Sequence, residues 1–293
     1  MKILLNEKEY AEQVLNNKHL DKKPTFDLRI LAKYYRWVEG LTQHKIYLKL
    51  VSLMEEKYND FSIAKWQDML LNLSKQSKKY KLIEINYIPV TKNELLTIDD
   101  IQSKPMKRLA FTLLCLAKYR NEINPNNNDW LNYKFKDIFK MSNINFTKKE
   151  QGFIIYDMKA MGLIKMNKMV DNLSINVCYI DKTNSDEVLQ IKDFRNLGYE
   201  YLLYSGEKFI RCEECGILVR QNKQNNRIYC TECNKYIPQE TKTITCIEPN
   251  CGKEVEIDAW DMKTCRCKEC QDIRDKETKK ERNKRYYQKK SQN

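Results

Sequence analysis

The sequence predicts an α+β protein that is assembled from several small modules. Three observations lead to this fold class. Apolar residues recur every three or four positions through most of the first 80 residues, as they do in amphipathic helices. Helix-start signals and a hairpin pattern follow between residues 103 and 181. Two sets of paired cysteines then occupy residues 212–270, ahead of a highly charged C-terminal segment. A chain of 293 residues has room for two or three domains.

Residues 1–102 are expected to form a mostly helical N-terminal domain. Four of its segments show helical spacing of apolar residues, and Gly40 and the pair Asn59-Asp60 mark helix ends between them. A short strand is expected in "KLIEINYIPV", where apolar residues alternate. Thr91 and Glu94 then have the spacing of a capping box, which predicts a brief helix.

Residues 103–181 carry a more specific pattern. Ser103 and Pro105 open a helix with proline in its first turn, and "YKFKDIFKM" predicts a second, short helix. Thr147 and Glu150 form another capping box, which opens a third helix that Gly162 ends. "LIKMNK" and "LSINVCYI" then read as a β-hairpin. On the third helix, the side expected to pack inward carries Phe153, Ile154, Met158 and Met161.

Two helices, a capped third helix and a hairpin follow one another in a winged helix-turn-helix, in which the third helix enters the major groove of DNA. The exposed face of this helix, which also carries Asp157, and the hairpin are expected to contact DNA through Lys148, Lys149, Gln151, Lys159, Lys165 and Lys168. An alternative stays open. Winged folds also serve as protein-binding modules, and surface lysines are commonly just solvated.

Residues 182–210 are expected to link the two halves of the chain by packing. "EVLQI" predicts a strand, and "FRNLGYEYLLYSGEKFI" predicts a short, aromatic-rich helix that leads into the first cysteine pair. Tyrosines on an apolar stripe belong more often to a core than to a base-stacking surface. Cys115 and Cys178 also lie in apolar patterns, where a small buried side chain is expected.

The first cysteine set has the spacing of a four-cysteine metal site. Two Cys-x-x-Cys pairs are separated by fourteen residues, and Gly216 follows the first pair, where a tight turn is needed. In a reducing cytosol such pairs indicate metal more often than disulfides. The sequence therefore predicts a zinc ribbon over residues 211–236, with four ligands: Cys212, Cys215, Cys230 and Cys233.

A second, less regular set predicts another zinc ribbon over residues 243–270. Its first pair is spaced Cys-x4-Cys, and three cysteines compete for the second pair. Cys267 is favoured because it forms a two-residue knuckle with Cys270, whereas Cys265 is the alternative ligand. The expected ligands are Cys246, Cys251, Cys267 and Cys270.

Both zinc ions are expected to be structural. A catalytic zinc keeps a position open for water, usually beside histidine or carboxylate ligands, whereas four thiolates close the coordination sphere. The only histidines are His19 and His44, far from the cysteines, and no phosphate-binding G-x-x-x-x-G-K-[ST] loop occurs. We therefore expect no catalytic residues.

The C-terminal segment, residues 271–293, has nine Lys or Arg residues against four Asp or Glu residues. It reads as a solvated helix with a basic far end, because no apolar stripe runs along it. This tail either binds nucleic acid or keeps the protein soluble. Its candidate phosphate contacts are Lys279, Lys280, Arg282, Lys284 and Arg285.

Charge and hydropathy restrict the partners. The formal net charge is +13, and two zinc ions on eight thiolates leave about +9, so the chain stays basic. This favours a polyanion such as double-stranded DNA. The opening "MKILLNEKEY" has an apolar run too short for a signal peptide, and no later stretch is long enough to span a membrane. We expect a cytoplasmic protein with no membrane partner.

Three stretches carry a resemblance: "KRLAFTLLCLAKY", "FRNLGYEYLLYSGEKFIRCEECGILVRQN" and "CGKEVEIDA" with the later "CKEC" and basic tail. Over nearly its whole length the chain resembles early-region proteins of phages and prophages of low-GC Gram-positive bacteria. Some members of that group resemble directionality factors that bind a phage serine integrase. The resemblance implies a mobile-element setting in the cytoplasm of a bacterial host. The wide Cys246–Cys251 spacing departs from the group's usual second knuckle.

Two functions follow from these patterns. The first is a non-catalytic accessory or regulatory factor that binds double-stranded DNA. The second is a protein-binding adaptor, such as a directionality factor that grips a phage integrase or another phage or host protein. A steep fall of affinity with salt distinguishes DNA binding from protein binding.

Overall fold

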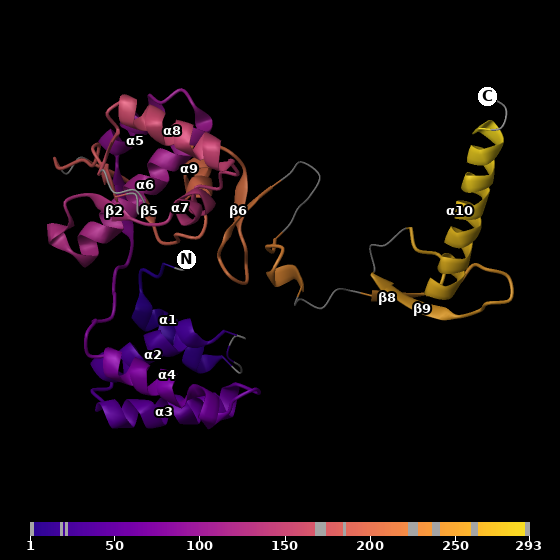
Figure 1. The fold of residues 1–293 in the computed structure, drawn as a ribbon, viewed down its shortest axis with the longest axis horizontal. Coiled ribbons are helices and arrows are strands. Elements are labelled where there is room, and N and C mark those ends of the chain that lie inside the picture. Colours follow the sequence, from indigo (N-terminus) through magenta and orange to yellow (C-terminus); the bar gives the residue numbers. More distant parts are fainter. Residues whose placement is uncertain are drawn as a thin grey trace. The chain divides into compact units, whose positions relative to one another are not determined.

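The computed structural model describes residues 3–17, 20, 23–167, 174–183, 186–221, 228–235, 241–258 and 263–290 (Figure 1). The chain divides into two compact units, residues 1–230 and residues 231–293, and each is described by itself. The first unit holds two hydrophobic clusters, and the second holds a hairpin and a long helix.

The N-terminal region is helical, as predicted. Its helices are α1 (Glu7–Asn16), α2 (Thr25–Trp37), α3 (Gln43–Lys57) and α4 (Ile63–Gln76). Their apolar faces meet in a cluster that includes fully buried Leu28, Ile46, Leu50, Met54 and Leu70. Gly40 has φ +68° after α2, a left-handed conformation that glycine adopts without a Cβ penalty.

Strand β1 (Ile88–Thr91) follows and takes up only the end of the predicted 81–90 strand. The capping box of Thr91 and Glu94 is confirmed at the start of α5 (Lys92–Asp99). The Glu94 carboxylate is fully buried and pairs with the Lys118 ammonium at 2.9 Å, so the cap also anchors α5 to the next helix.

The middle of the first unit contains a helical layer and a three-stranded sheet. The elements are α6 (Lys104–Ile123), the short 3-10 helix η1 (Pro125–Asn127), β2 (Trp130–Asn132), α7 (Phe135–Met141), α8 (Lys148–Ala160), β3 (Ile164–Met166) and β4 (Ser174–Val177). The strands are antiparallel in the order β2-β4-β3. Strand β2 was not among the predicted elements, whereas the hairpin of β3 and β4 is confirmed. The capping box of Thr147 and Glu150 is also confirmed.

Helix α8 packs inward on a different face from the predicted one. Ile154, Ile155 and Met158 are buried, but Phe153 is 58% exposed and Met161 is 54% exposed. The prediction for these two residues is therefore wrong. The inward face of α8 is shifted toward Ile155, whereas Ile154 and Met158 face the core as expected.

Residues 187–191 and 197–204 form the predicted strand and helix, β5 (Glu187–Ile191) and α9 (Leu197–Tyr204). Strand β5 pairs antiparallel with β1, and α9 packs along α6, with the rings of Phe111 and Tyr201 5.6 Å apart. Both elements belong to the larger hydrophobic cluster through Ile191, Leu197 and Tyr201. Cys115 is buried as predicted, whereas Cys178 is exposed, contrary to the prediction.

The cysteine-rich part contains short strands. In the first unit, β6 (Phe209–Arg211) pairs with β7 (Leu218–Arg220), and these strands flank the first Cys-x-x-Cys turn. In the second unit, the 3-10 helix η2 (Cys233–Lys235) is followed by the hairpin of β8 (Thr241–Thr245) and β9 (Glu254–Asp258). The predicted C-terminal helix is present as α10 (Lys268–Lys290).

Candidate metal centres and nucleic-acid interface

The first cysteine cluster brings together the four predicted ligands, Cys212, Cys215, Cys230 and Cys233, whose sulfur atoms all lie within 4.8 Å of one another. The turn between β6 and β7 positions two of them. It closes through the Gly216 N–H, which donates to the Cys212 carbonyl at 2.8 Å, and Gly216 has φ +70°. The Cys230 N–H donates to the Cys212 sulfur at 3.2 Å, which brings the second pair to the first.

The spacing of the sulfurs fits a tetrahedral metal. Four sulfurs at about 2.3 Å from a central zinc ion are about 3.8 Å from one another. The Cys215 and Cys230 sulfurs are 3.7 Å apart, and so are those of Cys251 and Cys267 in the second cluster. Both clusters therefore match the dimensions of a closed four-thiolate site.

The first cluster also favours thiolate at its most buried ligand. Burial raises the pKa of Cys212, but backbone N–H donors from Cys230, Cys215 and Glu214 more than offset this and lower the pKa to about 6. A thiolate is the form that binds metal, so the backbone prepares this sulfur for coordination.

The second cluster contains Cys246, Cys251, Cys267 and Cys270, again within 4.8 Å of one another. Gly252, with φ +58°, forms the turn after the wide first pair, and the Cys246 N–H donates to the Lys253 carbonyl at 2.9 Å. Backbone N–H donors from Cys267 and Glu248 lower the pKa of Cys246 to about 7.

The fifth cysteine of this region lies outside the cluster. The Cys265 carbonyl accepts from the Ile247 N–H at 3.0 Å, and its sulfur lies 3.5 Å from the Arg266 guanidinium. The structure thus gathers Cys267, rather than Cys265, with the other three sulfurs. The two groups of four cysteines can hold two metal ions. Over the ranges that the structure describes, no other group of three or more His, Cys, Asp or Glu side chains gathers in this way.

The predicted DNA-contacting face of α8 is largely exposed. Lys148, Lys149 and Lys159 are in solvent, as is Lys165 on β3. Gln151 is half-buried, and its side-chain amide donates to the Phe146 carbonyl at 2.8 Å, so it is turned toward the backbone before α8. Lys168 lies outside the described residues.

Sequence reasoning missed three further exposed lysines, which precede α8 in the chain. Lys134, Lys136 and Lys140 are exposed at and along α7. Their signal is visible in "YKFKDIFKM", which places three lysines within seven residues. From residue 133 to residue 167 the chain has seven lysines and only three carboxylates. One of these, Glu150, is occupied by the Thr147 cap, and the hydrogen bonds from Thr147 lower its pKa. The surface of α7, α8 and β3 is therefore net positive.

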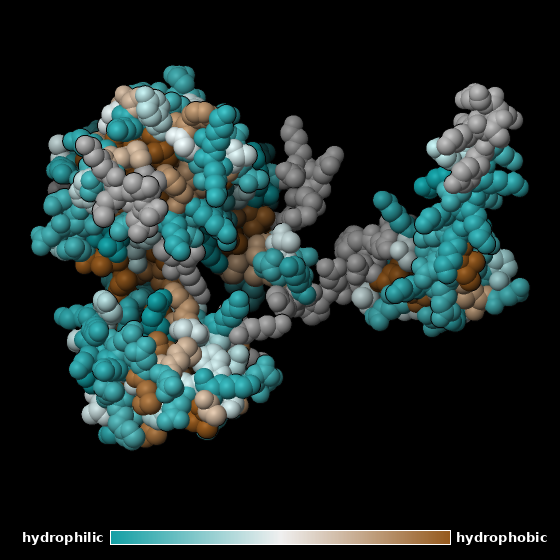
Figure 2. All heavy atoms as spheres, viewed as in Figure 1, coloured by the Kyte–Doolittle hydropathy of each residue, from teal (hydrophilic) through white to brown (hydrophobic). Residues whose placement is uncertain are grey.

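From residue 271 onward the described side chains of helix α10 are exposed, and Figure 2 shows hydrophilic side chains over most of the helix. Ile273 and Tyr286 are 57% and 62% exposed, so neither is a core residue of this helix. The predicted basic residues, Lys279, Lys280, Arg282, Lys284 and Arg285, are all exposed. One weak ion pair, Glu281–Arg285 at 3.8 Å, follows the i,i+4 spacing.

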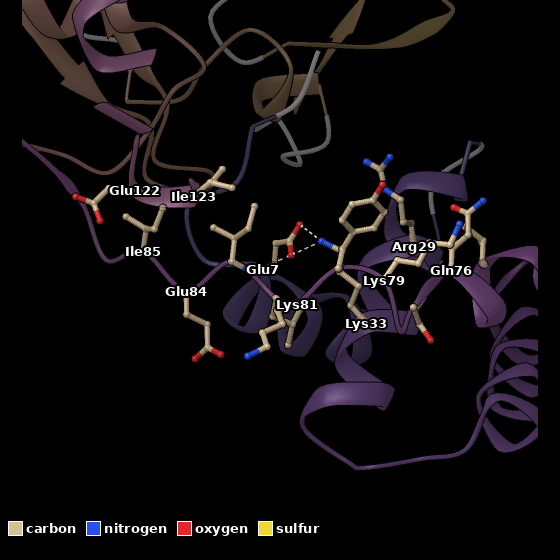
Figure 3. Close-up of a pocket in the computed structure, with 15 residues that line it drawn as sticks. Glu7, Arg29, Lys33, Gln76, Lys79, Lys81, Glu84, Ile85, Glu122 and Ile123 are labelled. Atoms are coloured by element: carbon tan, nitrogen blue, oxygen red, sulfur yellow. Dashed lines mark hydrogen bonds and ion pairs between the residues drawn. The ribbon is translucent and has the colours of Figure 1, made fainter. Parts of the chain in front are cut away.

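A separate pocket of about 890 Å³ lies beside the N-terminal helices (Figure 3). It is lined by cations, including Arg29, Lys33 and Lys81, and by the glutamates Glu7, Glu84 and Glu122. Glu7 and Lys33 bind each other at 2.7 Å, and Glu7 also accepts the Ile83 N–H at 3.0 Å. These contacts hold the helices to the segment before β1, so we assign the pocket a structural role.

No family model, no curated protein and no solved structure matches this chain. In the part of the chain that the structure describes, no helix is both long and apolar enough to cross a membrane. The assignment of function therefore depends on the geometry of the cysteine clusters and of the basic surface.

Proposed function

We propose that each cysteine cluster binds one structural zinc ion. Closed sets of four thiolates suit zinc, and the sulfur separations of 3.7 Å agree with its bond lengths. Such an ion supplies folding free energy to a small module. Two-stranded hairpins such as β6-β7 and β8-β9 are marginal by themselves, so they need this additional stabilisation.

Residues 103–181, in this proposal, form a winged helix-turn-helix unit that binds double-stranded DNA. The observation that carries the proposal is the element order α6-β2-α7-α8-β3-β4 with the sheet order β2-β4-β3, combined with exposed lysines on α7, α8 and β3. In such units the helix corresponding to α8 lies in the major groove. The basic residues of α10 add a second, sequence-independent attraction to phosphate.

The resulting function is that of a non-catalytic, zinc-containing accessory or regulatory factor. The early-region phage and prophage setting that the sequence resemblance implies is part of the same proposal, as is the cytoplasm of a bacterial host. The closed thiolate sites support a non-catalytic role, because they leave no open position on the metal. The basic surface supports the binding of a polyanion.

A second candidate is a protein-binding adaptor such as a recombination directionality factor. The observation that favours it is the exposure of Phe153, Tyr156 and Met161 on or next to α8, because exposed large apolar side chains mark interaction surfaces.

Charge reversal tests the DNA-binding proposal. Lys148, Lys149 and Lys159 are replaced by glutamate together, and binding to duplex DNA is measured by fluorescence anisotropy between 50 and 200 mM salt. The matched control reverses Lys45, Lys65 and Lys75, which are exposed on α3 and α4, and it changes the net charge equally. We expect the α8 variant to lose at least ten-fold in affinity and about two to three units of salt slope, while the control stays close to wild type. Equal losses in both variants, or no DNA binding by the wild type at low salt, would contradict the proposal.

A further inference from the structure

Helix α8 presents an exposed stripe that consists of Lys149, Gly152, Phe153, Tyr156 and Lys159. These residues are spaced by three or four positions, so they lie along one face of the helix. Phe153 is 58% exposed and Tyr156 is 69% exposed. The stripe therefore has lysines at both ends and two aromatic rings between them.

The fold does not require the two aromatic rings in these positions. The buried side of α8 is already complete, because Ile154, Ile155 and Met158 fill the core contact. Gly152 has nothing within 4 Å of a Cβ built on it, so the surface beside the rings is open. Two large rings held in water by a short helix indicate a surface that is covered by a partner.

The charge of the stripe identifies the partner as a polyanion. The Lys149 ammonium lies 5.7 Å from the centre of the Phe153 ring, and further exposed lysines occur on α7 and β3. Lysine is depleted at the centres of protein–protein interfaces, whereas it is the common ligand of nucleic-acid phosphates. Charge complementarity thus favours DNA over a protein.

The length of the stripe fits the major groove. Lys149 and Lys159 are ten positions apart, which corresponds to about 15 Å along a helix axis. The major groove of B-DNA is about 12 Å wide. With the rings facing the base edges, the lysines at the two ends of the stripe can reach backbone phosphates.

We propose that Phe153 and Tyr156 are specificity-determining residues that recognise the methyl groups of thymine in the major groove. The C5-methyl of thymine is the one apolar group at the floor of that groove, and apolar side chains such as phenylalanine recognise it by contact. This inference rests on the proposed function, since it requires α8 to lie in the groove. It adds the class of sequence that the protein prefers, namely sites that contain thymine opposite the centre of α8.

Replacement of thymine by deoxyuridine tests the proposal, because this change removes only the methyl group. A preferred duplex is first selected from a random library with the zinc-loaded full-length protein. The selected duplex is then made with thymine and with deoxyuridine at the selected positions. Binding of the wild type, of Phe153→Ala, of Tyr156→Ala and of the exposed control Val188→Ala on β5 is measured on both duplexes.

The wild type and Val188→Ala should bind the thymine duplex about four-fold more tightly for each methyl group that is contacted, the loss expected for one buried methyl. Phe153→Ala and Tyr156→Ala should lose part or all of this preference while they retain their circular dichroism spectrum and the salt slope set by the lysines.

Three results would overturn the inference. The first is that the wild type binds both duplexes equally. The second is that the two alanine variants keep the full preference for thymine. The third is that their affinity for DNA is unchanged, which would mean that the rings contact a protein partner. In each of these cases the protein still binds duplex DNA, and the proposed function survives. Failure of the proposed function has a different signature, namely that no duplex binds even at low salt.

Discussion

Gly198 lies directly against the backbone carbonyl of Ser142, and a Cβ built on Gly198 would be 1.9 Å from that oxygen. Gly198 is in the first turn of α9, and Ser142 ends α7. The next residue, Asn143, has φ +55° and is bound by α9 as well, because its side-chain oxygen accepts the Tyr199 N–H at 3.2 Å. Helix α9 therefore fixes the turn that leads from α7 into α8.

Replacement of Gly198 by alanine should destabilise the first unit by about 1–3 kcal/mol, the usual cost of forcing an extra group into a packed contact. The clash is with backbone atoms, which cannot move aside as a flexible side chain can. Urea denaturation of both proteins measures the change. Gly152→Ala is the matched control, because it is also helical but faces open space, and it should stabilise the protein by about 0.4–1 kcal/mol. Equal stability of Gly198→Ala and wild type would contradict the close approach.

The same segment of the chain connects the turn to the first cysteine cluster. The Arg195 guanidinium donates to the Cys215 carbonyl at 2.6 Å, and the Asn196 side chain donates to the Leu218 carbonyl at 3.2 Å. The Asn143 side chain in turn donates to the Asn196 side-chain oxygen at 3.0 Å. Residues that the sequence presents as a linker therefore form a hydrogen-bonded connection between the first cysteine turn and the turn before α8.

Local signals in the sequence predicted the local features well. The capping boxes at Thr91 and Thr147 depend on residues three positions apart, and both are formed. The spacing of the cysteines likewise reflects short turns. Each of these features is decided by neighbouring residues, so no knowledge of distant contacts was needed.

Features that depend on distant partners were missed. Strand β2 has only three residues, and its partner β4 begins 42 residues after β2 ends. The inward face of α8 was also unpredictable from spacing, because Phe153 and Ile155 are both apolar and the core selects only one of them. The basic patch on α7 was visible in the sequence, but its exposure depends on how α7 packs.

Metal content separates the ligand assignments of the second cluster. The wild type should contain about two zinc ions per chain, Cys267→Ser about one, and Cys265→Ser about two, because Cys265 lies outside the group of four sulfurs. Inductively coupled plasma mass spectrometry on protein purified without added metal gives these numbers. Limited proteolysis should show that the second unit becomes sensitive only in Cys267→Ser, since zinc binding supplies its folding free energy. The reverse result for the two variants would assign the ligand to Cys265.

Stability at alkaline pH should depend on Tyr35, which is 3% exposed in the N-terminal cluster. Burial, with a further contribution from Glu39, raises the pKa of Tyr35 from 10.0 to about 12. The folded state thus holds this proton more tightly than the unfolded state does. The contribution of protonated Tyr35 to the free energy of unfolding is therefore fully present below pH 10 and is lost as the pH rises toward 12.

Comparison with Tyr35→Phe isolates this effect from the titration of lysines. The difference in free energy of unfolding between wild type and Tyr35→Phe should stay constant from pH 7 to pH 9 and move against the wild type above pH 10. Tyr80→Phe is the control, because it removes the same hydroxyl from a side chain that is 64% exposed. Parallel pH profiles for all three proteins would show that Tyr35 is not shielded from water.

Deletion of residues 271–293 should leave the fold and the metal content intact. The cut keeps all eight cysteines of the two clusters, and it also keeps the ion pair between Lys253 and Glu269. Every described side chain that it removes is exposed, so no apolar core is lost. Circular dichroism and zinc analysis should therefore match the wild type apart from the helix that is removed.

The same deletion should weaken DNA binding by a similar factor on every sequence and should make the salt dependence shallower, because a helix of lysines and arginines contacts phosphates and not bases. A second variant separates charge from length: Lys279, Lys280, Arg282, Lys284 and Arg285 are all changed to glutamine, which removes five positive charges and keeps the helix. If electrostatic attraction is the cause, the glutamine variant should reproduce most of the loss of affinity and of salt slope. A different result is that the glutamine variant binds DNA like the wild type while the deletion variant binds more weakly. This would mean that α10 acts through its length or through a partner. Sequence-dependent losses in either variant would mean that the tail reads bases, which contradicts its assignment as a phosphate contact.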